Sequence, residues 1–227
     1  LGKNNTVDSV LPQQMIDAKG NIIYGIKEVA AGAYHTLAIK EDNTVWSVGY
    51  NGSGQFGLNN TSNYYLPQKM LSEDGNKILT NIKKVAAGTI HTLVLTEEGT
   101  AYAVGYSGYG QLGNGTNKTQ MLPVKMIDKD KNVVKNIKDI AAGYNFNLAV
   151  DSNGYVYSWG YNGYGQLGDN STVSRSIPTR IEGLEKIKNV YSYGNTSMAI
   201  NENGEIYVWG YGYNKVPTKL DFYSKAV

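Results

Sequence analysis

Apolar and polar residues alternate in a segment that recurs four times along the chain. One set of equivalent positions holds Trp46, Tyr102, Tyr157 and Tyr207, and the set two residues later holds Val48, Val104, Trp159 and Trp209. Large side chains spaced two residues apart lie on one face of a β-strand. Turn-like tetrapeptides such as "EDNT" at 41–44 precede these segments and contain Asn or Gly, which tolerate a positive φ. We therefore predict strands joined in hairpins and no helix.

The whole pattern repeats every 50 to 56 residues. The segments "IKEVAAGAYHTLAI", "IKKVAAGTIHTLVL", "IKDIAAGYNFNLAV" and "IKNVYSYGNTSMAI" begin at Ile26, Ile82, Ile137 and Ile187. We predict four strands per repeat: "VAAG", "HTLAIK" or its equivalent, "TVWSVG", and a fourth that begins at "LP". Four short strands in each of several repeats of this length are typical of an all-β propeller with four-stranded blades. We predict one propeller over 1–227, with repeats at 3–57, 58–113, 114–168 and 169–227.

The prolines follow the same period. Each of the chain's five prolines occupies one repeat position: Pro12, Pro67, Pro123, Pro178 and Pro217. The first four each lie ten residues after a glycine, so Leu1 and Gly2 look like the end of a preceding "GQLG" turn. We expect the chain to begin inside one repeat and to end at the start of another. The "AAG" triplets would lie near the propeller axis, where backbones crowd, and the large Trp and Tyr side chains would fill the wedge between blades.

The pattern "VAAGxxHTLA", followed by a "GYNGYGQLG"-type turn and a proline ten residues later, resembles the regulator of chromosome condensation repeat family. The resemblance covers essentially the whole chain and implies the seven-bladed propeller of that family. This chain has four repeats, and its last repeat lacks "GQLG". We therefore expect an open arc that exposes an apolar face at each end, and that is part of a larger ring or closes its ring by self-association.

The resemblance also carries functional expectations. The best-known family member exchanges guanine nucleotide on a small GTPase and binds chromatin. The chain also resembles the propeller-type β-lactamase inhibitory protein of bacteria, which binds a protein with one face of its ring. We therefore expect a non-enzymatic scaffold that binds a protein partner with one loop face. A carbohydrate or cell-wall binding module and a guanine-nucleotide exchange factor are the alternatives.

Composition fits a protein rich in turns and narrows the classes of partner. The 227 residues include 27 Gly and 19 Tyr but only 3 Phe. The 21 Lys and Arg are scattered and nearly balance 19 Asp and Glu, so we expect no nucleic-acid partner. No cysteine is present, which excludes disulfides and thiolate metal sites. No stretch predicts membrane insertion. Richness in Asn, Lys and Tyr resembles proteins of low-GC bacteria and suggests an extracellular or cell-surface location.

The glycine-rich turn "GYNGSGQFG" at 49–57 recurs at 105–113 and 160–168. A phosphate-binding loop precedes a helix, whereas this turn precedes a loop and a strand, and it occurs three times. We predict a tight connection between blades in which Gln55, Gln111 and Gln166 hydrogen-bond to nearby backbone. No cofactor is expected.

His35 and His91 share one repeat position, which Phe146 and Thr196 occupy in the other repeats. A catalytic or metal-binding histidine needs convergent partners, and no acidic residue recurs at a fixed offset. We predict hydrogen-bonded structural histidines, and neither a catalytic residue nor a metal site.

The two residues between "AAG" and "HT" vary while their neighbours stay almost constant. In the propeller they would lie near the axis, on one face of the ring. We predict a binding surface there, with ordinary loop variation as the alternative. The candidates are Ala33, Tyr34, Thr89, Ile90, Tyr144, Asn145, Gly194 and Asn195.

Tyrosines recur in the glycine-rich turn at Tyr50, Tyr106, Tyr161 and Tyr211, and again three residues later at Tyr109 and Tyr164. Repetition at one position favours packing between equivalent neighbours. The alternative is that Tyr109 and Tyr164 stack on sugar rings.

Overall fold

The computed structural model describes residues 2–7 and 9–221, which form four antiparallel four-stranded sheets and no helix. The first sheet contains β1 (Ile26–Ala31), β2 (His35–Lys40), β3 (Val45–Gly49) and β4 (Tyr64–Lys69), and the second contains β5 (Ile82–Ala87), β6 (His91–Thr96), β7 (Ala101–Gly105) and β8 (Gln120–Lys125). The third contains β9 (Ile137–Ala142), β10 (Phe146–Asp151), β11 (Val156–Gly160) and β12 (Arg175–Arg180), and the fourth contains β13 (Ile187–Tyr193), β14 (Thr196–Asn201), β15 (Ile206–Gly210) and β16 (Thr218–Lys219). The predicted all-β propeller with four blades is confirmed.

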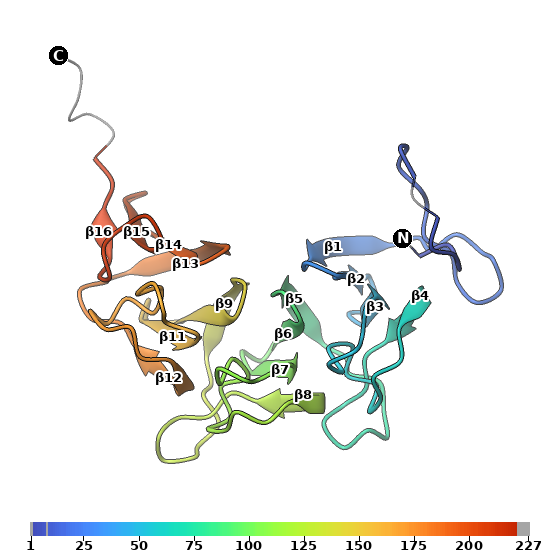
Figure 1. Ribbon diagram of the computed structural model, residues 1–227, viewed down its shortest axis with the longest axis horizontal. Helices are drawn as coiled ribbons and strands as arrows, with labels where there is room; N and C mark the ends of the chain where they lie inside the picture. The colour runs from blue at the N-terminus through green and yellow to red at the C-terminus, as the bar shows by residue number, and fades with distance from the viewer. Residues whose placement is uncertain (1, 8, 222–227) are drawn as a thin grey trace.

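The four sheets stand side by side in an open arc, with β1, β5, β9 and β13 on its inner side (Figure 1). Within each sheet the strands pair in chain order, because every connection is a hairpin or a longer antiparallel return. The N-terminal segment lies beside the first sheet, at the opposite end of the arc from β16. The arc matches the expected geometry. Completion of a ring by further blades or by self-association stays a prediction.

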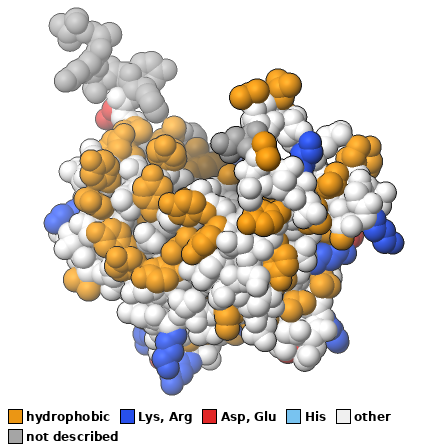
Figure 2. Space-filling view, turned by 45° about the vertical axis from the view of Figure 1, so that its right-hand side comes forward, with side chains coloured by type: hydrophobic (Ala, Val, Ile, Leu, Met, Phe, Trp, Pro, Cys, Tyr) orange, Lys and Arg blue, Asp and Glu red, His pale blue; other side chains and the backbone are white. Residues whose placement is uncertain are grey.

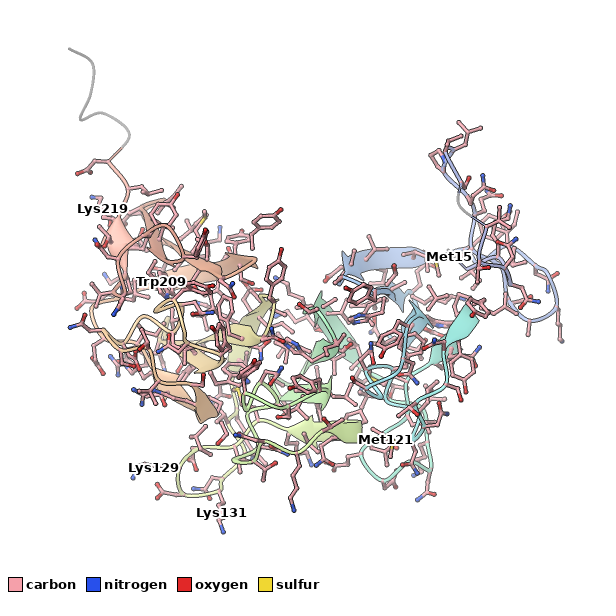
Figure 3. All side chains as sticks on the ribbon, viewed as in Figure 1. Met15, Met121, Lys129, Lys131, Trp209 and Lys219 are labelled. Atoms are coloured by element: carbon pink, nitrogen blue, oxygen red, sulfur yellow. The ribbon has the colours of Figure 1, made fainter. Side chains whose placement is uncertain are left out.

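Hydrophobic cores lie between neighbouring sheets. Trp159 of the third sheet is 1% exposed and packs with Leu93 of the second sheet and with Leu112 of the β7–β8 turn. Trp209 of the fourth sheet is fully buried with Leu167 of the β11–β12 turn, and Figure 3 labels it at the C-terminal end of the arc. These two tryptophans fill the wedge between blades as predicted.

Close approach explains the glycine of the "AAG" triplet. A Cβ added to Gly32 would lie 2.4 Å from the carbonyl oxygen of Gly88 in the next blade. A Cβ on Gly88 would lie 2.0 Å from the ring of His91, so the second-strand ring packs directly on this glycine. Backbone crowding near the axis and this ring both require the absence of a side chain.

Two details of the strand prediction were wrong. The fourth strands β4, β8 and β12 begin three residues before their proline, where the prediction placed the start one residue before it. The strand β16 contains only the two residues that follow Pro217. Among the described residues around Pro12 there is no strand, and the nearby segment has only an isolated bridge between Ile16 and Ile22. In the four sheets a fourth strand pairs with the third strand of its own blade, and the described residues before Pro12 contain no strand with which it could pair.

The predicted repeats and the observed sheets are offset by one strand. The repeat at 58–113, for example, spans β4 of the first sheet and β5 to β7 of the second. The division of the chain into those four repeats and one domain stays a prediction.

Candidate binding face

The turns that follow the four innermost strands meet near the axis of the arc. The Thr89 amide donates to the carbonyl oxygen of Tyr144 at 3.0 Å, and the Tyr144 amide donates to that of Gly194 at 2.8 Å. Backbone hydrogen bonds thus tie the turns of three blades to one another. The first residue of each predicted pair, from Ala33 to Gly194, lines a shared hollow of about 230 Å³.

The second residue of each pair has a structural role in the last two blades. Gln111 Nε2 donates to Asn145 Oδ1 at 3.4 Å, and Gln166 Nε2 donates to Asn195 Oδ1 at 3.1 Å. Both asparagines thereby fix the glycine-rich turn of the preceding blade. Their variation from blade to blade is therefore partly a matter of packing, which the sequence pattern did not separate from binding.

The first joint between blades lacks this contact because Ile90 stands where Asn145 and Asn195 stand later. Gln55 Oε1 still accepts from the Ser53 amide at 3.0 Å, so the glutamine holds its own turn as predicted. Its buried Nε2 has no hydrogen-bond partner among the described residues.

An aromatic pocket of about 450 Å³ opens beside Asn195. Its lining residues are Tyr144, Tyr164, Tyr193, Gly194, Asn195, Thr196 and Tyr211. The four tyrosine side chains are 46% to 86% exposed. The predicted protein-binding residues Tyr144, Gly194 and Asn195 and the predicted sugar-stacking residue Tyr164 thus share one pocket. Tyr34, Thr89 and Ile90 lie outside it.

Sequence reasoning missed Tyr193. It occupies the repeat position of Gly32, Gly88 and Gly143, where a ring from the second strand otherwise packs. Thr196 replaces that ring in the fourth blade and leaves space, so a large side chain is tolerated there. A tyrosine in place of a glycine was the signal that could have identified it.

The turn tyrosines form a continuous row across three blades. Ring centroids are 6.4 Å apart for Tyr106 and Tyr109, 4.8 Å for Tyr109 and Tyr161, 6.2 Å for Tyr161 and Tyr164, and 5.0 Å for Tyr164 and Tyr211. Interplanar angles of 58° to 83° make most of these contacts edge-to-face. Ser53 replaces the tyrosine in the first blade, so the row starts at Tyr106. The tyrosines pack on one another and still leave one side of the row exposed.

The two histidines connect neighbouring blades. His91 Nε2 donates to Asn147 Oδ1 at 2.8 Å, and Asn147 Nδ2 donates to the carbonyl oxygen of Gln111 at 2.7 Å. His35 Nε2 donates in the same way to Thr92 Oγ1 at 3.1 Å. Asn147 Nδ2 and Thr92 Oγ1 each donate to a backbone oxygen, so Asn147 Oδ1 and Thr92 Oγ1 accept from the histidines. Each neutral ring is therefore assigned its proton on Nε2.

Burial lowers the pKa of the His91 ring to about 4, and burial together with the nearby His91 lowers the pKa of the His35 ring to about 4. Both rings are therefore neutral at pH 7.

Charged side chains lie mainly away from the aromatic pocket. On the face drawn in Figure 2, hydrophobic side chains gather over the C-terminal part of the arc and lysines and arginines lie toward its periphery. Lys129 and Lys131 project from the outer edge of the β8–β9 loop in Figure 3. Within 2–7 and 9–221, no cluster of three His, Cys, Asp or Glu residues could hold a metal ion. The same residues contain no helix that is long and apolar enough to cross a membrane.

Blades of four antiparallel strands, joined by buried tryptophans and a repeated glycine-rich turn, define a repeat propeller. The chain belongs to the RCC1-like domain family, which it matches over residues 1–217. The resemblance seen in the sequence is confirmed.

Among curated proteins, the chain is 33% identical to the ultraviolet-B receptor UVR8 of Arabidopsis thaliana over 80% of this chain and 39% of UVR8. It is 27% identical to a protein RCC2 homolog of Xenopus laevis over 80% of this chain and 38% of that protein. The chain thus spans about two fifths of the length of these relatives.

Two solved structures share the fold. Human WBSCR16 superposes with a TM-score of 0.77 at 23% identity, covering 89% of this chain and 54% of WBSCR16. Prp20p of Saccharomyces cerevisiae superposes with a TM-score of 0.73 at 23% identity, covering 89% of this chain and 52% of Prp20p. The Prp20p structure is described with its binding to Gsp1p and histones.

The expected extracellular or cell-surface location is wrong. The curated relatives UVR8 and the RCC2 homolog are intracellular proteins of the nucleus or cytoplasm. These relatives are eukaryotic, so the expectation of a bacterial, secreted protein has no support from them.

Proposed function

We propose that this chain is a protein-binding module that uses the loop face around the aromatic pocket. The observation that carries the proposal is the pocket itself, where four exposed tyrosines surround Asn195. Tyrosine is enriched in protein interfaces because its ring supplies a large, rigid contact area and its hydroxyl remains able to hydrogen-bond. The turns beneath it are joined by backbone hydrogen bonds, so little ordering is needed on binding.

The proposal of a protein partner rests on the aromatic pocket and on membership of the RCC1-like domain family. Prp20p binds Gsp1p and histones according to its structural description, but an identity of 23% supports only the shared fold. The identity of the partner for this chain, including a small GTPase whose nucleotide it would exchange, therefore stays a prediction. A non-enzymatic role is part of the same proposal.

Carbohydrate binding is the second candidate, and the exposed tyrosine row favours it. Tyr109 and Tyr164 are 41% and 46% exposed. Their rings contact other tyrosines mostly edge-to-face, so an open face could stack on a sugar. Retention of the chain in polysaccharide affinity gels, and its loss in the variant Tyr109→Ala with Tyr164→Ala, would favour this candidate over a protein partner.

A display library of protein fragments tests the main proposal. We expect selected fragments to bind the chain and to lose affinity by about tenfold or more when Tyr144 and Tyr193 are both replaced by Ala. The matched control replaces Lys129 and Lys131 with Ala at the outer edge, where affinity should not change. Equal loss in both variants, or no loss in either, would place binding elsewhere.

A further inference from the structure

The tyrosine row and the aromatic pocket form one continuous surface. Tyr164 and Tyr211 belong to both, since they close the row and line the pocket. The two steps from Tyr109 through Tyr161 to Tyr164 measure 4.8 and 6.2 Å between ring centroids. The rings contact one another, and Tyr109, Tyr164 and Tyr211 remain 41%, 46% and 62% exposed, so the row offers a run of exposed aromatic surface that leads into the pocket.

The polar groups of this surface include several hydrogen-bond donors. Asn195 Oδ1 already accepts from Gln166 Nε2, which leaves its Nδ2 group to donate. The hydroxyl of Thr196 donates to the backbone oxygen of Tyr211, so it is occupied. No hydroxyl of the four pocket tyrosines bonds to another group within the described residues. A ligand with free acceptors would therefore find donors in the Asn195 Nδ2 group and in the tyrosine hydroxyls.

Charge disfavours a cationic ligand. No Asp or Glu is among the described residues that line the pocket. The side chain of Lys215 lies against Gly165, the residue after Tyr164. An aromatic cage for a methylated ammonium group works best when the cation is desolvated without a competing positive charge.

A polyproline II helix meets these requirements. It has no internal hydrogen bonds, so its carbonyl oxygens remain free to accept. Its pyrrolidine rings pack on exposed aromatic side chains, which is how proline-rich segments bind aromatic-lined grooves in other folds.

We propose that this surface binds a proline-rich segment of a protein partner in the polyproline II conformation. The segment lies along Tyr109, Tyr161 and Tyr164, and its end enters the pocket at Tyr211. The proposal rests on the proposed protein-binding function and specifies the chemistry of the partner.

Fluorescence anisotropy with labelled deca-proline tests this assignment on the whole chain. We expect deca-proline to bind about tenfold more tightly than a (Gly-Ser)5 peptide, because the latter must be ordered on binding. Tyr211→Ala should reduce affinity for deca-proline by about tenfold, and Tyr211→Phe should reduce it severalfold through loss of the hydroxyl alone. Tyr50→Ala is the matched control, since Tyr50 has the same repeat position but lies outside the row.

Equal binding of the two peptides, or equal effects of Tyr211→Ala and Tyr50→Ala, would overturn the proposal. Tighter binding of a trimethyl-lysine peptide or of a chito-oligosaccharide would also overturn it. If library fragments bind through Tyr144 and Tyr193 while deca-proline does not bind, only this inference fails. If no protein fragment or peptide binds and the oligosaccharide does, the proposed function fails with it.

Discussion

Acid should destabilise this protein through two buried histidines as the pH falls below 6.5. His91 Nε2 carries the proton that Asn147 accepts, so protonation of the ring would add a proton at Nδ1. Nδ1 of His91 and Nδ1 of His35 are both buried, and neither has a hydrogen-bond partner among the described residues. The cost of a buried, unpaired N–H explains why the pKa of each ring falls to about 4.

The sign follows from linkage. An unfolded histidine binds a proton near pH 6.5, whereas each folded ring does so only near pH 4. Each histidine therefore contributes its full stability above pH 6.5, and that contribution is lost as the pH falls from 6.5 to 4. At pH 5 the loss is roughly 2 kcal/mol for each histidine, and it approaches roughly 3 kcal/mol below pH 4.

A pair of residues at the next joint suggests a variant that removes one of the two histidines. At the next joint, Phe146 replaces the histidine and Ser197 replaces its partner, and Ser197 Oγ donates to the backbone oxygen of Gln166 at 2.7 Å. His91→Phe with Asn147→Ser copies this natural pair. Urea unfolding at pH 7.5 and pH 5 should show the variant losing about 2 kcal/mol less than the original chain. Equal losses in the two proteins would refute the reasoning.

Three further predictions concern packing within and between the blades. Ile90→Asn should raise the free energy of unfolding by about 1 kcal/mol, because the new side-chain oxygen can accept from the buried Nε2 of Gln55. An unchanged urea midpoint would contradict this. Gly88→Ala should lower the free energy of unfolding by about 2 kcal/mol or more, since the added methyl meets the ring of His91, and thermal unfolding measures the loss. Asp139→Ala should lower the free energy of unfolding by about 2 kcal/mol, because this buried residue, 4% exposed, accepts a hydrogen bond from the backbone amide of Val190 in the fourth blade. A thermal midpoint equal to that of the original chain would exclude this role.

The sequence by itself determined the architecture of the blades. Repetition of an alternating strand, a hairpin turn and a small-residue triplet leaves few folds open, because each blade must bury the same faces against its neighbour. Trp159 and Trp209 were placed between blades on this ground alone. The prediction of a strand at Pro12 was wrong, because a local sequence pattern does not form a strand without a neighbouring strand to pair with.

Only the tertiary structure decided how the candidate residues divide between packing and binding. Asn145 and Asn195 bond to glutamines 34 and 29 residues away in sequence, in the turns of preceding blades. Tyr144, Tyr164, Tyr193 and Tyr211 meet in one pocket for the same reason, since contacts between blades join positions about one repeat apart. The sequence of one repeat determines which side chains its blade carries, but the rotation from one blade to the next determines which side chains lie together.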